Sequence, residues 1–222
     1  MVDSKVAIYE LFKDASKCGL CGFENKASVP TPDEKYGTQD VDVMFLYERP
    51  GGNGPRRSGK ISFNNPDKTA EFTKKLALKH GFITENDWSG VYATNACLCC
   101  NTTKTGPKTN VEGAINNREI DNCKTFLKRQ IDILKPRVIA PCGKSALIAL
   151  SLVYPDSKEL VSKVGLKMDQ IVAKPIINDG VHPPIFPLFH PSPKTQNIYP
   201  GKEAQDEQWK QLKQFVDSIK SD

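Results

Sequence analysis

The sequence lacks several features that would place it in a familiar class of proteins. It has only three histidines and contains no internal repeat or low-complexity segment. Its most apolar stretch, residues 138–153, contains Gly143 and Lys144, so it is too short and too interrupted to span a bilayer. The first residues also lack the apolar core of a signal peptide. We therefore expect a cytoplasmic protein that does not bind membranes.

The composition is that of one globular domain, and we expect residues 1–222 to form it as a monomer. The hydrophobic content of 38% and the charged content of 26% are usual for soluble proteins. A chain of 222 residues buries one substantial core but is short for two domains. The net charge of +5 permits a nucleic-acid partner without requiring one.

Four short apolar runs predict buried strands. They cover residues 42–47, 91–96, 137–142 and 185–189. Turn residues bound the runs and helical stretches separate them, which is typical of a parallel sheet covered on both faces. The predicted fold class is therefore α/β. The polar residues that follow the strands should meet at one edge of the sheet, where such folds bind ligands.

The spacing of the other apolar residues predicts the helices. Residues 4–17 form one amphipathic pattern, with apolar side chains at i, i+3, i+4 and i+7. Asn65 and Pro66 suit the N-cap and first position of a second helix, which should end at Gly81. Further helices are predicted over residues 120–134, 146–153 and 209–219.

The seven cysteines are an odd number, and without a secretory signal they do not suggest a disulfide framework. Cys18 and Cys21 directly follow the first predicted helix, while Cys99 and Cys123 lie on either side of a polar loop. Four thiolates at these spacings predict a bound metal or iron–sulfur cluster. Tetrahedral zinc would use the same four ligands. Cys142 ends an apolar run and is expected to be a small core residue.

Six motifs in a fixed order carry a resemblance to a known family. They are C-G-L-C, Y-E-R-P-G, T-N-A-C-L-C, N-C-K-T-F-L, V-I-A-P-C-G-K-S-A-L and F-H-P-S-P-K, from Cys18 to just beyond Ser192. Each motif alone is weak, but the six in this order are specific. Through them the sequence resembles the uracil-DNA glycosylase superfamily, and within it the iron–sulfur branch called family 4.

The resemblance implies a hydrolase of base excision repair, associated with the nucleoid. Such an enzyme hydrolyses the N-glycosidic bond of uracil, the deamination product of cytosine, in single- or double-stranded DNA and leaves an abasic site. The implied fold has three α/β/α layers around a four-stranded parallel sheet, with the predicted strands in the order 2-1-3-4. The implied cofactor is a [4Fe–4S] cluster on the four cysteines named above, with zinc as the alternative. Cys97 and Cys100 are possible substitute ligands.

The resemblance also implies roles for the residues after the strands. Asn95 would read O4 and N3–H of uracil, a pattern that cytosine reverses. His190 would donate a hydrogen bond to O2 as negative charge develops there. Glu48 would orient the attacking water, or alternatively only brace its loop. Gly51 would line the substrate site.

Three further positions leave alternatives open. Phe63 would stack on the base, although Ser62 fits that register equally well and Phe63 also suits a core position. Tyr47 replaces a glycine of the family and would narrow the pocket. Arg49 replaces an alanine and would contact a phosphate. The departures at Tyr47 and Arg49 allow a second reading, a glycosylase for another deaminated or damaged base. A third reading, from a different class, is a catalytically silent iron–sulfur DNA-binding protein.

Overall fold

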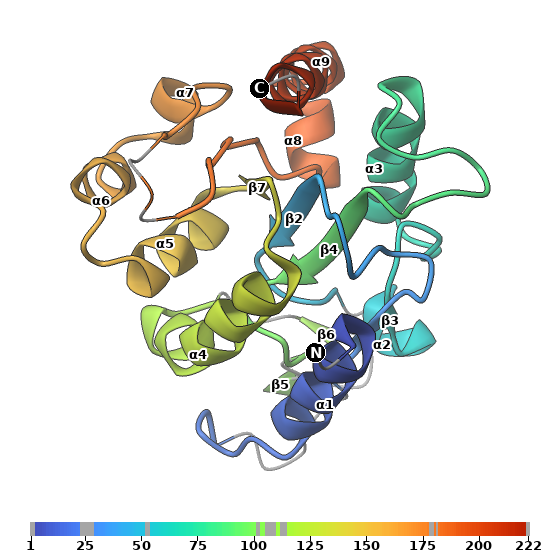
Figure 1. Ribbon diagram of the computed structural model, residues 1–222, viewed down its shortest axis with the longest axis vertical. Helices are drawn as coiled ribbons and strands as arrows, with labels where there is room; N and C mark the ends of the chain where they lie inside the picture. Colours follow the sequence, from blue (N-terminus) through green and yellow to red (C-terminus); the bar gives the residue numbers. More distant parts are fainter. Residues whose placement is uncertain are drawn as a thin grey trace.

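A three-stranded parallel sheet lies at the centre of the computed structural model (Figure 1). The structure describes residues 3–22, 29–51, 54–100, 103–104, 110–111, 115–177, 180 and 182–220, without the side chains of 103–104 and 110–111. The strand order is β4 (Val91–Asn95), β2 (Val43–Tyr47) and β7 (Val138–Pro141). Every residue of these strands is buried, which explains their largely apolar sequences, although β4 ends in the polar Thr94 and Asn95.

The predicted fourth strand is not a continuous strand in the described part of the chain. Residues 184–188 run parallel to β7 but join it only through isolated bridges, Ile139 to Ile185 and Cys142 to Leu188. Between these bridges, Pro141 has no N–H to donate to the facing carbonyl group, so the ladder is interrupted. The four-stranded order is thus not formed, although the first three predicted strands pair as expected.

Two small pairs of strands lie outside the central sheet. β1 (Thr31–Pro32) pairs in parallel with β3 (Lys60–Ile61). β5 (Thr103–Lys104) pairs in antiparallel fashion with β6 (Asn110–Val111), within a segment whose sequence predicts only a loop. Strands of two residues have too little apolar periodicity to be recognised from sequence.

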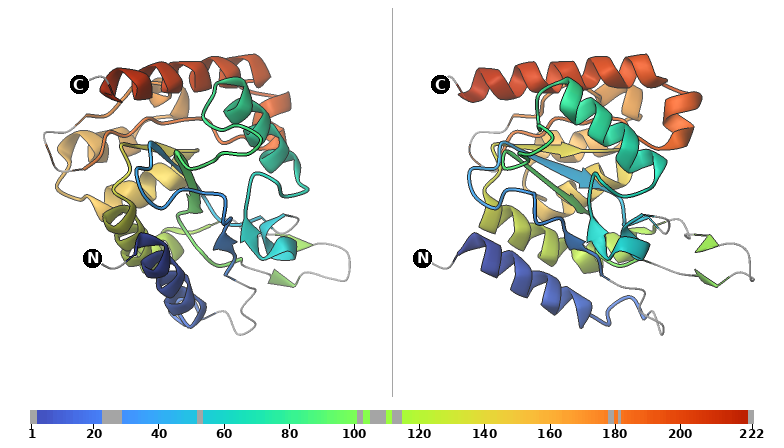
Figure 2. Two further views of the ribbon diagram at one scale, coloured as in Figure 1. Left: turned by 45° about the vertical axis from the view of Figure 1, so that its right-hand side comes forward. Right: turned by 90° about the vertical axis from the view of Figure 1, so that its right-hand side faces the viewer.

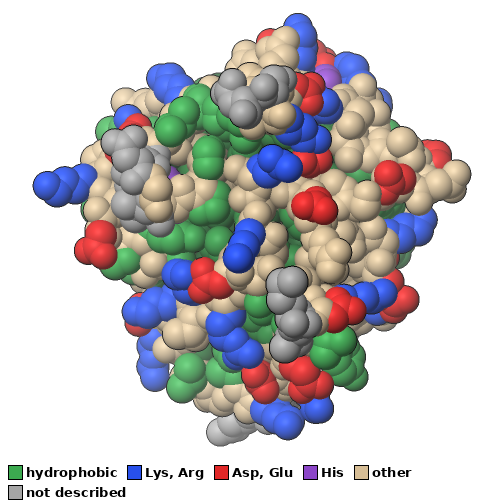
Figure 3. Space-filling model, viewed as in Figure 1, with side chains coloured by type: hydrophobic (Ala, Val, Ile, Leu, Met, Phe, Trp, Pro, Cys, Tyr) green, Lys and Arg blue, Asp and Glu red, His purple; other side chains and the backbone are tan. Residues whose placement is uncertain are grey.

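Helices cover both faces of the sheet. They are α1 (Ser4–Ser16), α2 (Pro55–Ser58), α3 (Lys68–Lys79), α4 (Asn117–Leu134), α5 (Lys144–Val153), α6 (Lys158–Val164), α7 (Met168–Ile171), α8 (Pro193–Asn197) and α9 (Lys202–Lys220). α3 and α9 lie on one face and α1 and α4 on the other (Figure 2). Basic and acidic side chains are interspersed over the face seen in Figure 3. Each described helix is too short or too polar to cross a membrane.

Four helix starts differ from the prediction. α4 begins at Asn117 rather than at residue 120, and α9 at Lys202 rather than at residue 209. α3 begins after Asp67, whose carboxylate accepts hydrogen bonds from the N–H groups of Thr69 and Ala70, both at 3.0 Å. The expected cap, Asn65, instead donates to the carbonyl group of Lys60. Aspartate and asparagine are equally good caps, so the sequence alone did not separate them. α5 begins two residues earlier than expected, directly after Gly143.

The core holds the terminal helices against the sheet. The apolar face predicted for α1 is buried, and α1 packs on α4. Trp209 of α9 stacks on Phe45 of β2, with ring centroids 4.7 Å apart and planes at 14°. This stack places α9 beside the strand whose end opens into the site described next.

Candidate active site and cysteine centre

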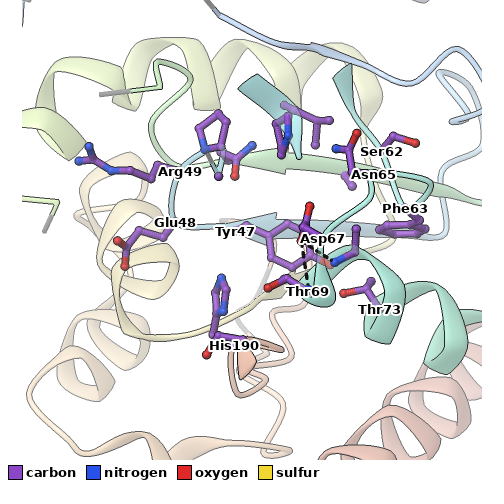
Figure 4. A pocket seen from close by; sticks show the side chains of 18 of the residues that line it. Tyr47, Glu48, Arg49, Ser62, Phe63, Asn65, Asp67, Thr69, Thr73 and His190 are labelled. Atoms are coloured by element: carbon purple, nitrogen blue, oxygen red, sulfur yellow. Dashed lines mark hydrogen bonds between the residues drawn. The ribbon is translucent and has the colours of Figure 1, made fainter. Parts of the chain in front are cut away.

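The carboxyl ends of β2 and β4 open into a pocket of about 440 Å³ (Figure 4). The six residues predicted for catalysis and substrate binding all line it: Tyr47, Glu48, Gly51, Phe63, Asn95 and His190. They come from four separate segments of the chain. The structure therefore brings together the residues that the sequence analysis placed after the strands, as expected for one edge of a parallel sheet.

Asn95 ends β4 and is the direct register partner of Tyr47 in β2. It is 3% exposed, and its Nδ2 has no hydrogen-bond partner among the described residues. A buried donor without an acceptor costs about 1–3 kcal/mol. This amide is therefore suited to a ligand that brings a carbonyl oxygen into the pocket.

His190 is held at its backbone by the turn that follows it. Its carbonyl group accepts hydrogen bonds from the N–H of Ser192, at 2.8 Å, and from the hydroxyl of Thr195. A Cβ at Gly143 would lie only 3.2 Å from the Cβ of His190, and Gly143 has a φ of 94°. Glycine is thus required where the start of α5 passes this histidine. The imidazole lies edge-to-face against Tyr47, with centroids 5.9 Å apart.

The surroundings of His190 favour its neutral form. Burial lowers the pKa of the imidazole, and the carboxylates of Glu48 and Asp67 oppose this shift only in part. A neutral imidazole has one N–H donor and one lone pair. At neutral pH the ring can therefore donate a hydrogen bond without carrying a full charge.

Glu48 follows β2 and is fixed at both its backbone and its side chain. Its carbonyl group accepts a 3.0 Å hydrogen bond from the N–H of Cys97. Its Oε2 accepts a 2.7 Å hydrogen bond from the hydroxyl of Ser145, in the first turn of α5. In Figure 4, Glu48 and His190 lie on one side of the Tyr47 ring and Phe63 lies on the other.

Phe63 belongs to both the pocket wall and the core. Its ring packs edge-to-face on Tyr36, with centroids 5.2 Å apart, and lies 5.6 Å from the ring of Trp88. Ser62, the alternative in the sequence register, also lines the pocket and donates a hydrogen bond to Asp33. The structure thus keeps both residues at the pocket.

Several lining residues were not anticipated from sequence. Asp67, Thr69 and Thr73 come from α3 and its N-cap. The preference of aspartate for the N-cap could have located Asp67. Nothing in the sequence predicts the contact of Ser145 with Glu48, because 97 positions separate the two residues.

Arg49 does not take the predicted position at a phosphate. Its Nη2 donates to Oε2 of Glu119 in α4 over 2.8 Å, and the two side chains are 4% and 8% exposed. In this structure the guanidinium is therefore paired inside the protein and not presented at the surface. The expectation from sequence was wrong because it could not include Glu119.

The four predicted cysteine ligands line a second, smaller cavity of about 20 Å³. Cys18 and Cys21 follow α1, Cys99 follows β4, and Cys123 lies in α4. Cys100 also lines this cavity, and none of the seven cysteines, all within the described residues, forms a disulfide. Cys97 and Cys142 are buried but do not line it.

The thiols of this centre influence one another. Burial, followed by the nearby Cys123, Cys18 and Cys21, raises the pKa of Cys99 to about 12. A hydrogen bond from Cys97 lowers the pKa of Cys123. Mutual repulsion of this kind is relieved when cationic iron or zinc binds the thiolates.

Both candidate cofactors bind through thiolates. Within the described ranges, no group of three or more His, Cys, Asp or Glu side chains is arranged to hold a metal ion. Zinc requires its thiolates at about 2.3 Å from one centre. A four-iron cluster is larger and binds one thiolate at each of its corners.

A family model establishes the relationship that the motifs suggested. Residues 34–213 match the model described as the uracil DNA glycosylase superfamily. The chain belongs to this superfamily. The match covers the pocket residues from Tyr47 to His190 and two of the predicted cluster ligands, Cys99 and Cys123.

Two relatives are each named type-4 uracil-DNA glycosylase. The protein from Pyrobaculum aerophilum is 27% identical over 143 residues, which are 64% of this chain and 62% of the relative. The protein from Sulfurisphaera tokodaii is 25% identical over 198 residues, which are 88% of this chain and 78% of the relative. The chain thus spans about three fifths of the length of the first relative, and the predicted resemblance to the family 4 branch is confirmed.

Proposed function

We propose that this protein is a uracil-DNA glycosylase that hydrolyses the N-glycosidic bond of deoxyuridine in DNA. The observation that carries the proposal is the unpaired amide of Asn95, buried in a pocket that also contains His190 and Glu48. Membership of the superfamily and the names of the two relatives support the same activity. The substrate base would enter the pocket after it leaves the DNA stack.

Asn95 is suited to reading the edge of uracil. Its Nδ2 would donate to O4, and its Oδ1 would accept from N3–H. Cytosine presents a donor and an acceptor in the opposite positions, so the amide would face mismatched groups. A site with buried polar groups rejects such a ligand strongly, because those groups then remain unpaired.

His190 and Glu48 would act on the two sides of the breaking bond. As the bond between C1′ and N1 breaks, its electron pair moves to the base, and negative charge develops at O2. The neutral imidazole of His190 would donate a hydrogen bond to this oxygen. Glu48, held by Ser145, would orient a water molecule. The oxygen of that water bonds to C1′, and its proton is released as the abasic sugar forms.

The cysteine centre would hold a [4Fe–4S] cluster through Cys18, Cys21, Cys99 and Cys123, with zinc as the alternative. When bound, the cluster would supply a covalent crosslink rather than a step of the reaction. Cys18 and Cys21 follow α1, whereas Cys123 belongs to α4. Binding would therefore tie the N-terminal helix to the body of the domain, which we propose to be a monomer acting on chromosomal DNA.

Excision assays on the purified protein test this proposal. Oligonucleotides with one uracil are incubated with protein purified anaerobically, and alkali then cleaves the abasic product. We expect cleavage at uracil, and a loss of about 10²–10³ in single-turnover rate for His190→Ala with DNA binding retained. His80→Gln, which changes a histidine that pairs with Asp206 outside the pocket, serves as the control and should cleave as the wild type does.

Two results would contradict the proposal. Cleavage at hypoxanthine or xanthine in preference to uracil would indicate a glycosylase for another base, as the replacement of a family glycine by Tyr47 allows. DNA binding without cleavage of any base would indicate a silent binding protein.

Iron and sulfide analysis of the same preparation tests the cluster, and zinc in place of iron would support the alternative cofactor.

A further inference from the structure

Two helices contact consecutive residues of the turn that follows β2. Ser145 of α5 donates to Glu48, and the next residue, Arg49, pairs with Glu119 of α4. The side chains of Arg49 and Glu119 are nearly sealed from solvent, whereas the other pair of arginine and carboxylate on α4, Arg129 with Asp14, is about half exposed. The ion pair at the turn is therefore a buried link between the pocket and α4.

The Glu119 carboxylate is also held in place by hydrogen bonds that do not involve Arg49. The N–H of Glu119 donates to Oδ1 of Asn116 at 2.9 Å, and its Oε2 accepts from the N–H of Asn116 at 2.9 Å. These reciprocal bonds form the capping box of α4. The carboxylate oxygen that pairs with Arg49 is therefore part of the rigid start of the helix.

Immediately before Arg49, the backbone of the turn is hydrogen-bonded to the residues that follow β4. The carbonyl groups of Tyr47 and Glu48 accept hydrogen bonds from the N–H groups of Ala96 and Cys97, at 2.7 and 3.0 Å. The ion pair of Arg49 attaches the next residue of the turn to a different element, α4. The backbone that carries the Glu48 carboxylate is thus held on both sides.

Stability does not account for this ion pair. Removing two charges from water offsets much of their attraction, so apolar residues of similar size would often serve as well. Moreover, Nε and Nη1 of Arg49 are buried without a hydrogen-bond partner among the described residues. What the pair supplies is one defined orientation of the turn.

We propose that Arg49 and Glu119 are positioning residues, whose ion pair fixes the turn of residues 47–51 against α4 and thereby holds Glu48 in place for excision. This inference rests on the proposed function. Arg49 also lines the pocket, and in this proposal its guanidinium acts through Glu48. Misplacing a reacting group by a small distance lowers the rate of the chemical step and leaves ground-state binding intact.

Four variants separate positioning from simple structural support. Glu119→Gln and Arg49→Met each remove one charge, and Arg49→Lys keeps the charge without the planar fork. Arg49→Met with Glu119→Gln removes both charges together and keeps a side-chain acceptor for the capping box of α4. Arg129→Met is the matched control, because it removes an exposed arginine from α4, the helix that carries Glu119. Single-turnover excision gives the maximum rate and the half-saturating DNA concentration separately.

We expect each single removal and the double variant to lower the maximum rate about 10- to 100-fold with little change in half-saturation. Arg49→Lys should recover part of the rate, and Arg129→Met should match the wild type. The double variant buries no unpaired charge, so it should melt near the wild-type temperature even if the single variants do not fold well. A wild-type maximum rate in the folded double variant, or a loss confined to DNA binding, would overturn the proposal.

A measurement without DNA tests the link independently of activity. Hydrogen exchange at the amides of Ala96 and Cys97, which donate to the turn, should be faster in the double variant than in the wild type. Unchanged exchange would overturn the positioning role. If the wild-type protein excised no uracil while exchange still rose in the variant, the proposed function would fail and the link would stand.

Discussion

The hydroxyl of Ser145 donates a 2.7 Å hydrogen bond to Oε2 of Glu48, joining the first turn of α5 to the turn after β2. A carboxylate that accepts such a bond has one oxygen fixed in place. Ser145 does not line the pocket, but through this hydrogen bond it holds Glu48, which does. Its removal should therefore affect the reaction more than the fold.

Ser145→Ala should lower the single-turnover excision rate about 10- to 100-fold, because a hydrogen bond to a charged group contributes roughly 1.5–3 kcal/mol. Ser145→Thr keeps the hydroxyl and should retain most of the rate. The measurement is the maximum rate at saturating DNA. Equal rates for the alanine variant and the wild type would show that Glu48 does not depend on this bond.

Asn95→Asp should abolish the preference for uracil. The carboxylate would repel O4 and could no longer donate to it, and a loss of about 10²–10³ in rate is typical for one well-placed group. Competition by free uracil provides a second readout, since the variant should also lose this inhibition. Wild-type excision by Asn95→Asp would place base recognition elsewhere in the pocket.

The stability of the protein should depend on His190 below neutral pH. Burial lowers the pKa of this imidazole, so the unfolded chain binds the proton more readily than the folded protein. The contribution of His190 is therefore complete above the ordinary histidine value of about 6.5 and is lost as the pH falls through the lowered pKa. Melting temperatures between pH 7 and 5 should fall more steeply for the wild type than for His190→Asn. Parallel curves would contradict the assigned environment.

Gly143→Ala should destabilise the protein by about 1–3 kcal/mol, because its backbone conformation is almost restricted to glycine. The added Cβ would also press on His190 at 3.2 Å, so the excision rate should fall as well. Gly165→Ala is the matched control, since Gly165 has a helical conformation and a nearest neighbour at 3.9 Å. Denaturant titration measures both variants. An effect of Gly143→Ala no larger than that of the control would refute the close approach.

Cys18→Ser should remove the proposed cluster and lower the melting temperature, because α1 would lose its crosslink to α4. Cys142→Ala changes a more deeply buried cysteine that lies outside the cavity, so it should keep the cluster. Visible absorption, iron content and melting temperature are compared for the two variants. Full iron content in Cys18→Ser would transfer the ligand role to another cysteine, with Cys100 as the candidate in the cavity.

The sequence located the residues whose positions follow from local pattern. Tyr47 and Asn95 end buried strands, so the edge at which they meet could be predicted from the sequence. His190 could be predicted in the same way, although its strand is interrupted beside Pro141. Periodicity and strand ends are local signals, and they sufficed to place these side chains at one edge of the sheet.

The supports of the site could not be predicted in this way. Glu119 and Ser145 lie at the starts of two helices, and each holds a residue far away in the chain. The choice of Asp67 over Asn65 as a cap likewise depends on how the chain enters α3. Contacts of this kind are decided by tertiary packing, for which a single sequence carries no local pattern.

Phe63 belongs to both the pocket wall and the core, and this limits how the base preference of the protein can evolve. The same ring faces the pocket and packs on Tyr36 and Trp88, so a mutation that enlarges this wall also opens a void in the core. Selection for a larger base at this wall would act against folding from the first substitution. Substitutions that change the base specificity should therefore arise first on the opposite side of the Tyr47 ring. Phe63 should change only after stabilising mutations elsewhere.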